Sequence, residues 1–276
     1  MTGDSLAARY DRDGFVFPID VISPETALTY RRCIEATEAK FADRLDVARF
    51  LRGSPHLVMP LVNELVRLPA ILDAVGPILG PDLLLWNCSF FDKAPHSDGF
   101  VSWHQDLTYW GLDATDEITA WLALAPATPE SGCMRFVPGS HKREIVPHRD
   151  TFAGDNLLTR GQELAVEVDE AEAVDVVLQP GQMSLHHGRT FHASGPNRSD
   201  DRRLGLAIRY IAPHMRQTVG AQDYAMLVRG KDDYGHFTLI DPPAADFAPD
   251  DVARCERIDA QEREYFYAGV PEALRG

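Results

Sequence analysis

Apolar residues in the first eighty positions recur mostly at three- and four-residue steps, the period of an amphipathic helix. Ser23-Pro24-Glu25 supplies an N-cap, a proline for the first turn and an early carboxylate, and the chain then runs to about Asp43 without glycine or proline. A second helical region is predicted over residues 59–75, where Pro69 should break or kink the helix and Gly76-Pro77 should end it. We therefore expect these eighty residues to form a helical buttress against a sheet.

The periodicity changes after residue 80. Several stretches alternate apolar and polar positions or are continuously apolar, as strands packed on one or both faces are. The predicted strands include residues 83–91, 117–124, 173–178, 183–190 and 204–211. Residues 195–201 indicate a hairpin connection, and Gln179-Pro180-Gly181-Gln182 indicates a tight turn. Strands predominate, so we expect a mainly β protein with flanking helices.

Two segments depart from this pattern. Residues 143–172 carry many charges and are expected to leave the sheets as an excursion, which at this length is often a lid. Residues 213–276 are rich in acids and are expected to wrap the sheets, with a helix at about residues 251–267. We expect a single domain over residues 1–276, made of a buttress (1–80), a β core (81–212) and a C-terminal wrap (213–276).

The composition narrows the class of protein. An apolar content of 45% over 276 residues suits one soluble globular domain. No 18-residue apolar run occurs, and the first residues lack the basic and apolar regions of a secretory signal, so we expect no secretory leader. The net charge of −15, from 42 acidic and 27 basic residues, argues against binding to nucleic acid or anionic membranes, which need a positive field. With only 4 cysteines, a cytoplasmic location is expected.

His104 and Asp106 lie two residues apart in an extended segment, so their side chains project from the same face. A third metal ligand can come from the histidine-rich segment 185–197, which gives the candidate set His104, Asp106 and His192. Two imidazoles and one carboxylate leave three metal positions open, which suits Fe(II), a bidentate co-substrate and O2. Zinc is less suited, because no short Cys-x-x-Cys spacing relates Cys33, Cys88, Cys133 and Cys255.

Three histidines compete for the third ligand position. In one extended strand His186 and His192 share a parity, whereas His187 points to the opposite face unless a bulge intervenes. Parity therefore disfavours His187 and leaves the other two open.

Three further polar residues are candidates for binding. Arg203 follows His192 by eleven residues, and a buried arginine there could grip a carboxylate with its planar guanidinium. Arg135 and His141 lie by glycine-containing turns, where backbone can approach closely, and are candidate substrate contacts. The alternative is that each satisfies local backbone carbonyls.

Four separated motifs resemble those of the phytanoyl-CoA dioxygenase family of Fe(II)- and 2-oxoglutarate-dependent oxygenases. They are Trp103-His104-Gln105-Asp106, Thr119-Ala120-Trp121-Leu122-Ala123-Leu124, the run from Ser131-Gly132-Cys133 to Ser140-His141-Lys142, and His192-Ala193-Ser194-Gly195-Pro196-Asn197 continuing to Arg203. Their order and spacing cover about residues 80–212.

The resemblance implies a double-stranded β-helix, the jelly roll of the cupins, for residues 81–212. It implies that His104, Asp106 and His192 bind Fe(II), and that Arg203 pairs with the distal carboxylate of 2-oxoglutarate. It also places Ser194 and Trp121 near that co-substrate and Lys93 at the site, although Lys93 could instead be a solvated loop residue. His186 and His187 are then expected to be structural or to lie around the metal ligands.

The function implied by the resemblance is hydroxylation of a C–H bond of a small organic metabolite, with 2-oxoglutarate converted to succinate and CO2. One alternative is a non-catalytic metal-binding jelly roll, a sensor or binding protein, because fold does not fix function. Another is halogenation, for which related enzymes replace the metal carboxylate with a small residue; the presence of Asp106 argues against it. We expect a monomer or homodimer without nucleic-acid or membrane partners.

Overall fold

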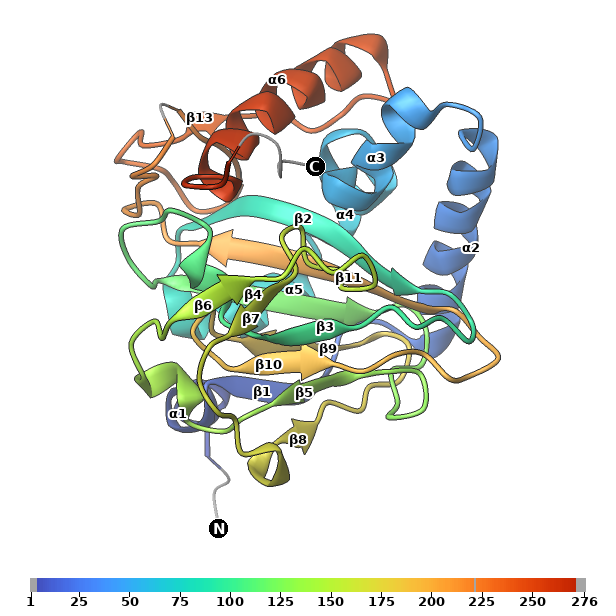
Figure 1. The fold of residues 1–276 in the computed structure, drawn as a ribbon. Helices are drawn as coiled ribbons and strands as arrows, with labels where there is room; N and C mark the ends of the chain where they lie inside the picture. Colours follow the sequence, from blue (N-terminus) through green and yellow to red (C-terminus); the bar gives the residue numbers. More distant parts are fainter. Residues whose placement is uncertain (1–3, 221, 272–276) are drawn as a thin grey trace. The chain divides into compact units, whose positions relative to one another are not determined.

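The computed structural model describes residues 4–220 and 222–271, so parts of the predicted buttress (1–3) and wrap (221 and 272–276) lie outside the described residues. The described α-helices are α1 (Leu6–Asp13), α2 (Pro24–Lys40), α3 (Leu45–Gly53), α4 (Pro60–Leu65), α5 (Pro69–Leu79) and α6 (Pro249–Phe266) (Figure 1). The described strands are β1 (Phe15–Asp20), β2 (Leu83–Lys93), β3 (Val101–His104), β4 (Glu117–Ala123), β5 (Met134–Phe136), β6 (His148–Asp150), β7 (Gln162–Leu164), β8 (Val174–Asp175), β9 (Gln182–His186), β10 (His192–Ser194), β11 (Arg203–Ile211), β12 (Tyr224–Arg229) and β13 (Thr238–Leu239).

The chain divides into two compact units. The first consists of residues 1–31, 91–108 and 119–206, and the second of residues 32–90, 109–118 and 207–276. Strands β2, β4 and β11 contribute residues to both units.

The first unit contains two antiparallel sheets. In one, β9 lies between β1 and β4; in the other, β10 lies between β3 and β5, and β8 pairs with β5. Phe136 of β5 packs against Phe15 of β1 and His186 of β9, with ring centroids 4.9 Å apart in each case. Side chains from both sheets therefore fill the space between them, which confirms the jelly roll.

The second unit combines helices with the strands β2, β12 and β13. β12 pairs antiparallel with β2 and parallel with β13. Ile71, Leu72 and Val75 of α5 are buried, and the hydroxyl of Tyr210 donates a 2.6 Å hydrogen bond to the carbonyl of Val66, just after α4. These contacts tie helices and strands of the unit together through apolar burial and a satisfied buried hydroxyl.

The N-terminal prediction is correct for α2 but wrong in two places. Phe15–Asp20 forms strand β1, because it pairs along β9, a tertiary contact that local periodicity cannot show. Pro69 breaks the second helical region, as predicted: α4 ends at Leu65, and Pro69 begins α5, where its missing N–H has no helical partner to lose. The predicted end at Gly76-Pro77 is the second error, because Pro77 lies inside α5, which continues to Leu79 before Gly80.

The connections around β10 also differ from expectation. The predicted strand 183–190 ends at His186, and a turn closed by the Thr190 N–H and the His187 carbonyl (2.8 Å) separates it from β10. Residues 195–201 do not form a hairpin, because β10 and β11 lie in different sheets. The tight turn at 179–182 is confirmed: Gly181 has φ +89° and the Gln182 N–H bonds to the Gln179 carbonyl at 3.0 Å.

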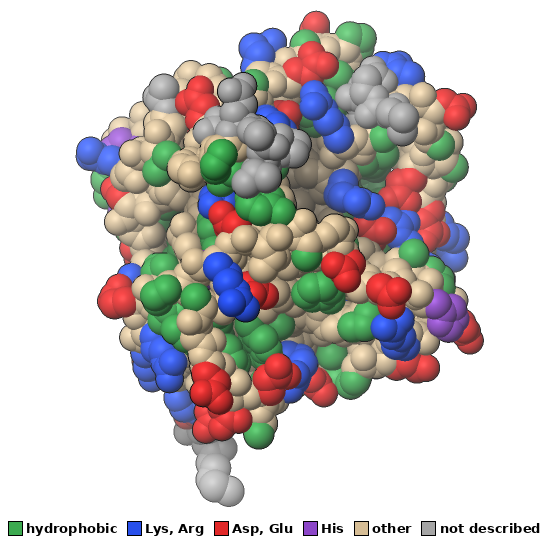
Figure 2. All heavy atoms as spheres, viewed as in Figure 1, with side chains coloured by type: hydrophobic (Ala, Val, Ile, Leu, Met, Phe, Trp, Pro, Cys, Tyr) green, Lys and Arg blue, Asp and Glu red, His purple; other side chains and the backbone are tan. Residues whose placement is uncertain are grey.

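The excursion 143–172 contains its own antiparallel pair, β6 and β7, and the C-terminal helix is confirmed as α6. Among the described helices, none combines the length and apolar character that a membrane crossing requires. On the face in Figure 2, acidic and basic side chains are interspersed rather than segregated.

Candidate functional site

His104, Asp106 and His192 come together at the ends of paired strands in the first unit. His104 is the last residue of β3, His192 is the first residue of β10, and the two are register partners. The Nε2 atoms of His104 and His192 lie 3.1 Å and 3.8 Å from Oδ1 of Asp106. One ligand atom from each residue lies within 4.8 Å of the others, and His104 and His192 are buried. The chain thus brings together the three residues that the sequence selected.

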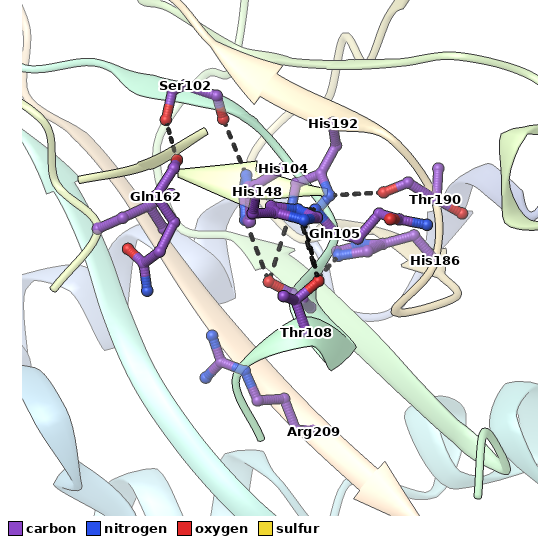
Figure 3. A network of polar contacts seen from close by, with 12 residues as sticks. Ser102, His104, Gln105, Thr108, His148, Gln162, His186, Thr190, His192 and Arg209 are labelled. Atoms are coloured by element: carbon purple, nitrogen blue, oxygen red, sulfur yellow. Dashed lines mark hydrogen bonds and ion pairs between the residues drawn. The ribbon is translucent and has the colours of Figure 1, made fainter. Parts of the chain in front are cut away.

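Backbone carbonyls orient both imidazoles. His104 Nδ1 lies 2.9 Å from the Ser102 carbonyl, and His192 Nδ1 lies 2.9 Å from the Thr190 carbonyl (Figure 3). A carbonyl can only accept, so Nδ1 donates and the Nε2 lone pair of each ring faces Asp106. This outer support is typical of metal-binding histidines, and a set of two nitrogens and one oxygen fits a divalent transition metal.

The charge states also suit metal binding. Burial, followed by the neighbouring His104, lowers the pKa of His192 well below its usual range. Burial alone would raise the pKa of Asp106, but the surrounding imidazoles outweigh it and hold that pKa well below its usual range. A neutral imidazole and an ionised carboxylate are the forms that coordinate metal.

Arg203 is a buried cation in the same unit. It is 1% exposed, its Nη1 donates to the Gly132 carbonyl at 2.8 Å, and its guanidinium lies 5.3 Å from the Trp121 ring centroid. Within the described part of the chain, no carboxylate oxygen lies in ion-pair range of Arg203, and its Nε has no hydrogen-bond partner. Because a buried charge without a counterion is costly, the arrangement favours an anionic ligand.

Lys93 is buried rather than solvated. Its Nζ donates to Ser194 Oγ at 2.7 Å and also contacts the carbonyl of Gly195. Burial, and then the positive charge of Arg203, lower the pKa of Lys93 to about 6. Lys93 and Arg203 are neighbours, because both contact the Gly132 carbonyl, and the Lys93 amine is held by protein acceptors.

The two other predicted substrate contacts have protein partners elsewhere. Arg135 Nη1 bonds to Glu170 Oε2 at 2.6 Å, and the Arg135 guanidinium lies 5.6 Å from the Trp103 ring centroid. His141 Nε2 lies 3.1 Å from the Asp11 carbonyl. The structure does not gather either residue into the triad, and a role in substrate binding stays a prediction.

Sequence reasoning missed Gln105 and His148. Gln105 is fully buried; its side-chain amide donates to the Arg189 carbonyl at 3.0 Å and accepts from the Val146 N–H at 2.9 Å. His148 Nε2 accepts from the Gln105 N–H at 3.1 Å. The two residues tie the excursion 143–172 to the segment between the metal-ligand candidates. Only the position of Gln105 between His104 and Asp106 could have pointed to it.

Comparison with known proteins agrees with the geometry. A family model described as phytanoyl-CoA dioxygenase matches residues 10–205. A probable alpha-ketoglutarate-dependent hypophosphite dioxygenase from Stutzerimonas stutzeri is 32% identical over 64% of this chain and 64% of its own length. The chain thus matches about half to two thirds of the length of such curated relatives.

Solved structures show the same fold. An apo non-heme monooxygenase, ThoJ, superposes with a TM-score of 0.86 at 36% identity, covering 95% of this chain and 97% of that one. CytC3 with Fe(II) and alpha-ketoglutarate has a TM-score of 0.67 at 24% identity, covering 87% of this chain and 93% of that one. Since the family model matches most of the sequence, this chain belongs to the phytanoyl-CoA dioxygenase family.

Proposed function

We propose that this protein is an Fe(II)- and 2-oxoglutarate-dependent oxygenase that hydroxylates a C–H bond of a small organic metabolite. One observation carries the proposal: a buried His-Asp-His set shares its unit with Arg203, a buried cation without a carboxylate partner among the described residues. The first group suits a metal, and the second suits the far end of a metal-chelating dicarboxylate. The named co-substrate of the hypophosphite dioxygenase relative supports the same assignment.

Iron suits the donor set better than zinc does. His104, Asp106 and His192 supply only nitrogen and oxygen, and all four cysteines are free thiols outside the set. Three protein ligands leave room for a bidentate acid and O2, whereas structural zinc sites close with four ligands.

Residues at the Arg203 end would hold the co-substrate. Arg203 would bind the distal carboxylate through its guanidinium, with the Trp121 ring against it, and Lys93, held by Ser194, would add a positive charge when protonated. Bound iron would supply the redox chemistry in which 2-oxoglutarate, O2 and the substrate C–H bond give succinate, CO2 and the hydroxylated product. The chain would orient the acid and keep bulk water from it.

Anaerobic titration tests the proposal. We expect the Fe(II)-loaded protein to develop a visible metal-to-ligand charge-transfer band when 2-oxoglutarate is added, and to form succinate once O2 and a substrate panel are supplied. The panel should contain small polar metabolites and phosphorus oxyacids. Absence of the band would favour a non-catalytic metal-binding protein, and chlorinated product in chloride buffer would contradict hydroxylation.

A further inference from the structure

His186 lies by Oδ2 of Asp106, whereas the contacts of the other two histidines with that carboxylate are to Oδ1. Nε2 of His186 lies 3.8 Å from Oδ2. Its ring centroid is 4.9 Å from that of His192, and Figure 3 shows both rings directed toward the centre of the network. Imidazoles from three strands, β3, β9 and β10, therefore surround a single carboxylate.

The surroundings of His186 fix its position. The residue is 2% exposed, and its backbone pairs with Phe15 of β1 on one side and Thr119 of β4 on the other. The ring of Phe136 lies 4.9 Å from its own ring. A side chain on a central strand with this packing cannot turn to solvent, so it stays against Asp106.

The geometry separates His186 from the metal-ligand candidates. A distance of 3.8 Å exceeds a normal hydrogen bond of about 2.7–3.2 Å, so the imidazole and the carboxylate interact here through charge and dipole. The same contact contributes to the low pKa of Asp106. His186 does not join the set of ligand atoms that lie within 4.8 Å of one another.

We propose that His186 is a positioning residue that presents Nε2–H to Oδ2 of Asp106, so that only Oδ1 is left to coordinate the metal. The inference rests on the proposed function, because it takes His104, Asp106 and His192 as the metal ligands. A carboxylate that used both oxygens would occupy one of the three positions needed by a bidentate acid and O2. His186 thereby keeps the third position open.

Cobalt binding provides a readout that does not depend on turnover. Co(II) absorption in the visible reports both affinity and coordination number. His186→Phe keeps an aromatic ring and removes the donor, whereas His186→Gln restores an N–H at about the reach of Nε2. His187→Phe is the matched control, because the His187 ring lies 6.3 Å from Tyr10 and 5.6 Å from His141 rather than against Asp106.

We expect His186→Phe to weaken Co(II) binding about 10- to 100-fold, as loss of a group that orients a metal ligand does, and to shift the Co(II) spectrum. Its affinity for 2-oxoglutarate in the Fe(II) form should fall further, because the open position is lost. His186→Gln should recover most of both affinities, and His187→Phe should match the parent protein.

Three results would overturn the inference: parental affinity and spectrum in His186→Phe, complete loss of metal as for a ligand, or no recovery in His186→Gln. Should His186→Phe not fold, His186→Asn, whose amide stops short of Nε2, replaces it in the comparison with His186→Gln. Failure of the parent protein to bind Co(II) and Fe(II) would instead overturn the proposed function, and this inference with it.

Discussion

Hydrogen bonds to backbone carbonyls decide which nitrogen each triad histidine offers. Ser102 and Thr190 provide these carbonyls, each two residues before its histidine. Because each contact spans only two residues, the local backbone conformation is enough to orient the ring. This explains why the ligand candidates could be named from sequence, whereas the neighbours that adjust them could not.

The first residue-scale prediction separates two histidines of the same segment. His192→Ala should abolish tight Fe(II) binding, because a set of three ligands loses both affinity and geometry with one imidazole. His187→Ala should retain iron, because its Nδ1 accepts from the Arg189 N–H at 2.9 Å rather than facing Asp106. Metal content after anaerobic loading distinguishes them; an empty site in His187→Ala with a full site in His192→Ala would refute the assignment.

The second concerns Arg203. Arg203→Ala should keep the metal but lose most of its affinity for 2-oxoglutarate, because a buried charge-assisted contact is removed. Arg202→Ala is the matched control: its guanidinium pairs with Asp92 at 3.2 Å, and co-substrate affinity should be unchanged. Titration of the charge-transfer band with 2-oxoglutarate measures the affinity of each variant. Equal losses of affinity in Arg203→Ala and Arg202→Ala would contradict the role of Arg203.

The third concerns proton uptake by Lys93. Its pKa is lowered from 10.5 to about 6 in the ligand-free protein, so at pH 8 the amine is mostly neutral. A bound carboxylate favours the ammonium form, so binding of 2-oxoglutarate should be accompanied by uptake of close to one proton at pH 8, about half a proton at pH 6 and almost none below about pH 5. Calorimetry of the metal-loaded protein in buffers of different ionisation enthalpy measures the uptake. It should disappear in Lys93→Met, and its persistence there would rule out Lys93 as the source.

At the scale of elements, the close approach of the neighbouring strands β4 and β11 determines the surroundings of Arg203. A Cβ added to Gly205 would lie 1.8 Å from Cζ2 of Trp121, so only glycine fits beneath this ring. Trp121 in turn lies against Arg203, two residues before Gly205 on β11. Gly205 therefore leaves the space that the Trp121 ring needs to lie against the Arg203 guanidinium.

Gly205→Ala should consequently lower the free energy of unfolding by about 3 kcal/mol, the upper range for overpacking, and should weaken 2-oxoglutarate binding by displacing Trp121. Gly53→Ala serves as control, because a Cβ there meets nothing within 4 Å. Denaturant unfolding and co-substrate titration give the two quantities. Parental stability in Gly205→Ala would show that β11 can move away from β4 at little cost.

Element connections were the least predictable feature. The strand expected over residues 183–190 ends at His186, so the parity argument that disfavoured His187 loses its premise of one continuous strand. His192 nevertheless joins His104 and Asp106, because β10 pairs with β3 and places His192 opposite His104. Local alternation identifies the faces of strands, but it does not reveal where a chain changes sheets.

At the scale of the whole molecule, the proposed metal and co-substrate residues all belong to the first unit. A ligand that binds only the folded state stabilises it by about 2.7 kcal/mol when the free ligand concentration is 100 times the dissociation constant. We therefore expect Fe(II) with 2-oxoglutarate to raise the unfolding temperature of the first unit, while 2-oxoglutarate without metal has a smaller effect. Anaerobic calorimetry measures the shift, and an equal shift in Arg203→Ala would contradict specific binding.

The sequence by itself determined the elements with strong local signals. Ser23-Pro24 marked the start of α2, and the apolar runs marked β2, β4 and β11. His104, Asp106, His192 and Arg203 were also selected, because a two-residue spacing on a strand and the family motifs are both readable along the chain. These features depend on neighbours in sequence, so no knowledge of packing is needed.

Only the tertiary structure decided the features that depend on distant pairing. β1 forms because it pairs with β9, which is remote in sequence. The side-chain amide of Gln105 connects two remote segments, because it bonds to the backbone of Arg189 and of Val146. The Lys93 amine is buried because Ser194, about a hundred positions away in the sequence, lies against it. Burial of a polar group is set by which segments meet around it, and that information is spread over the whole chain rather than held in any one stretch.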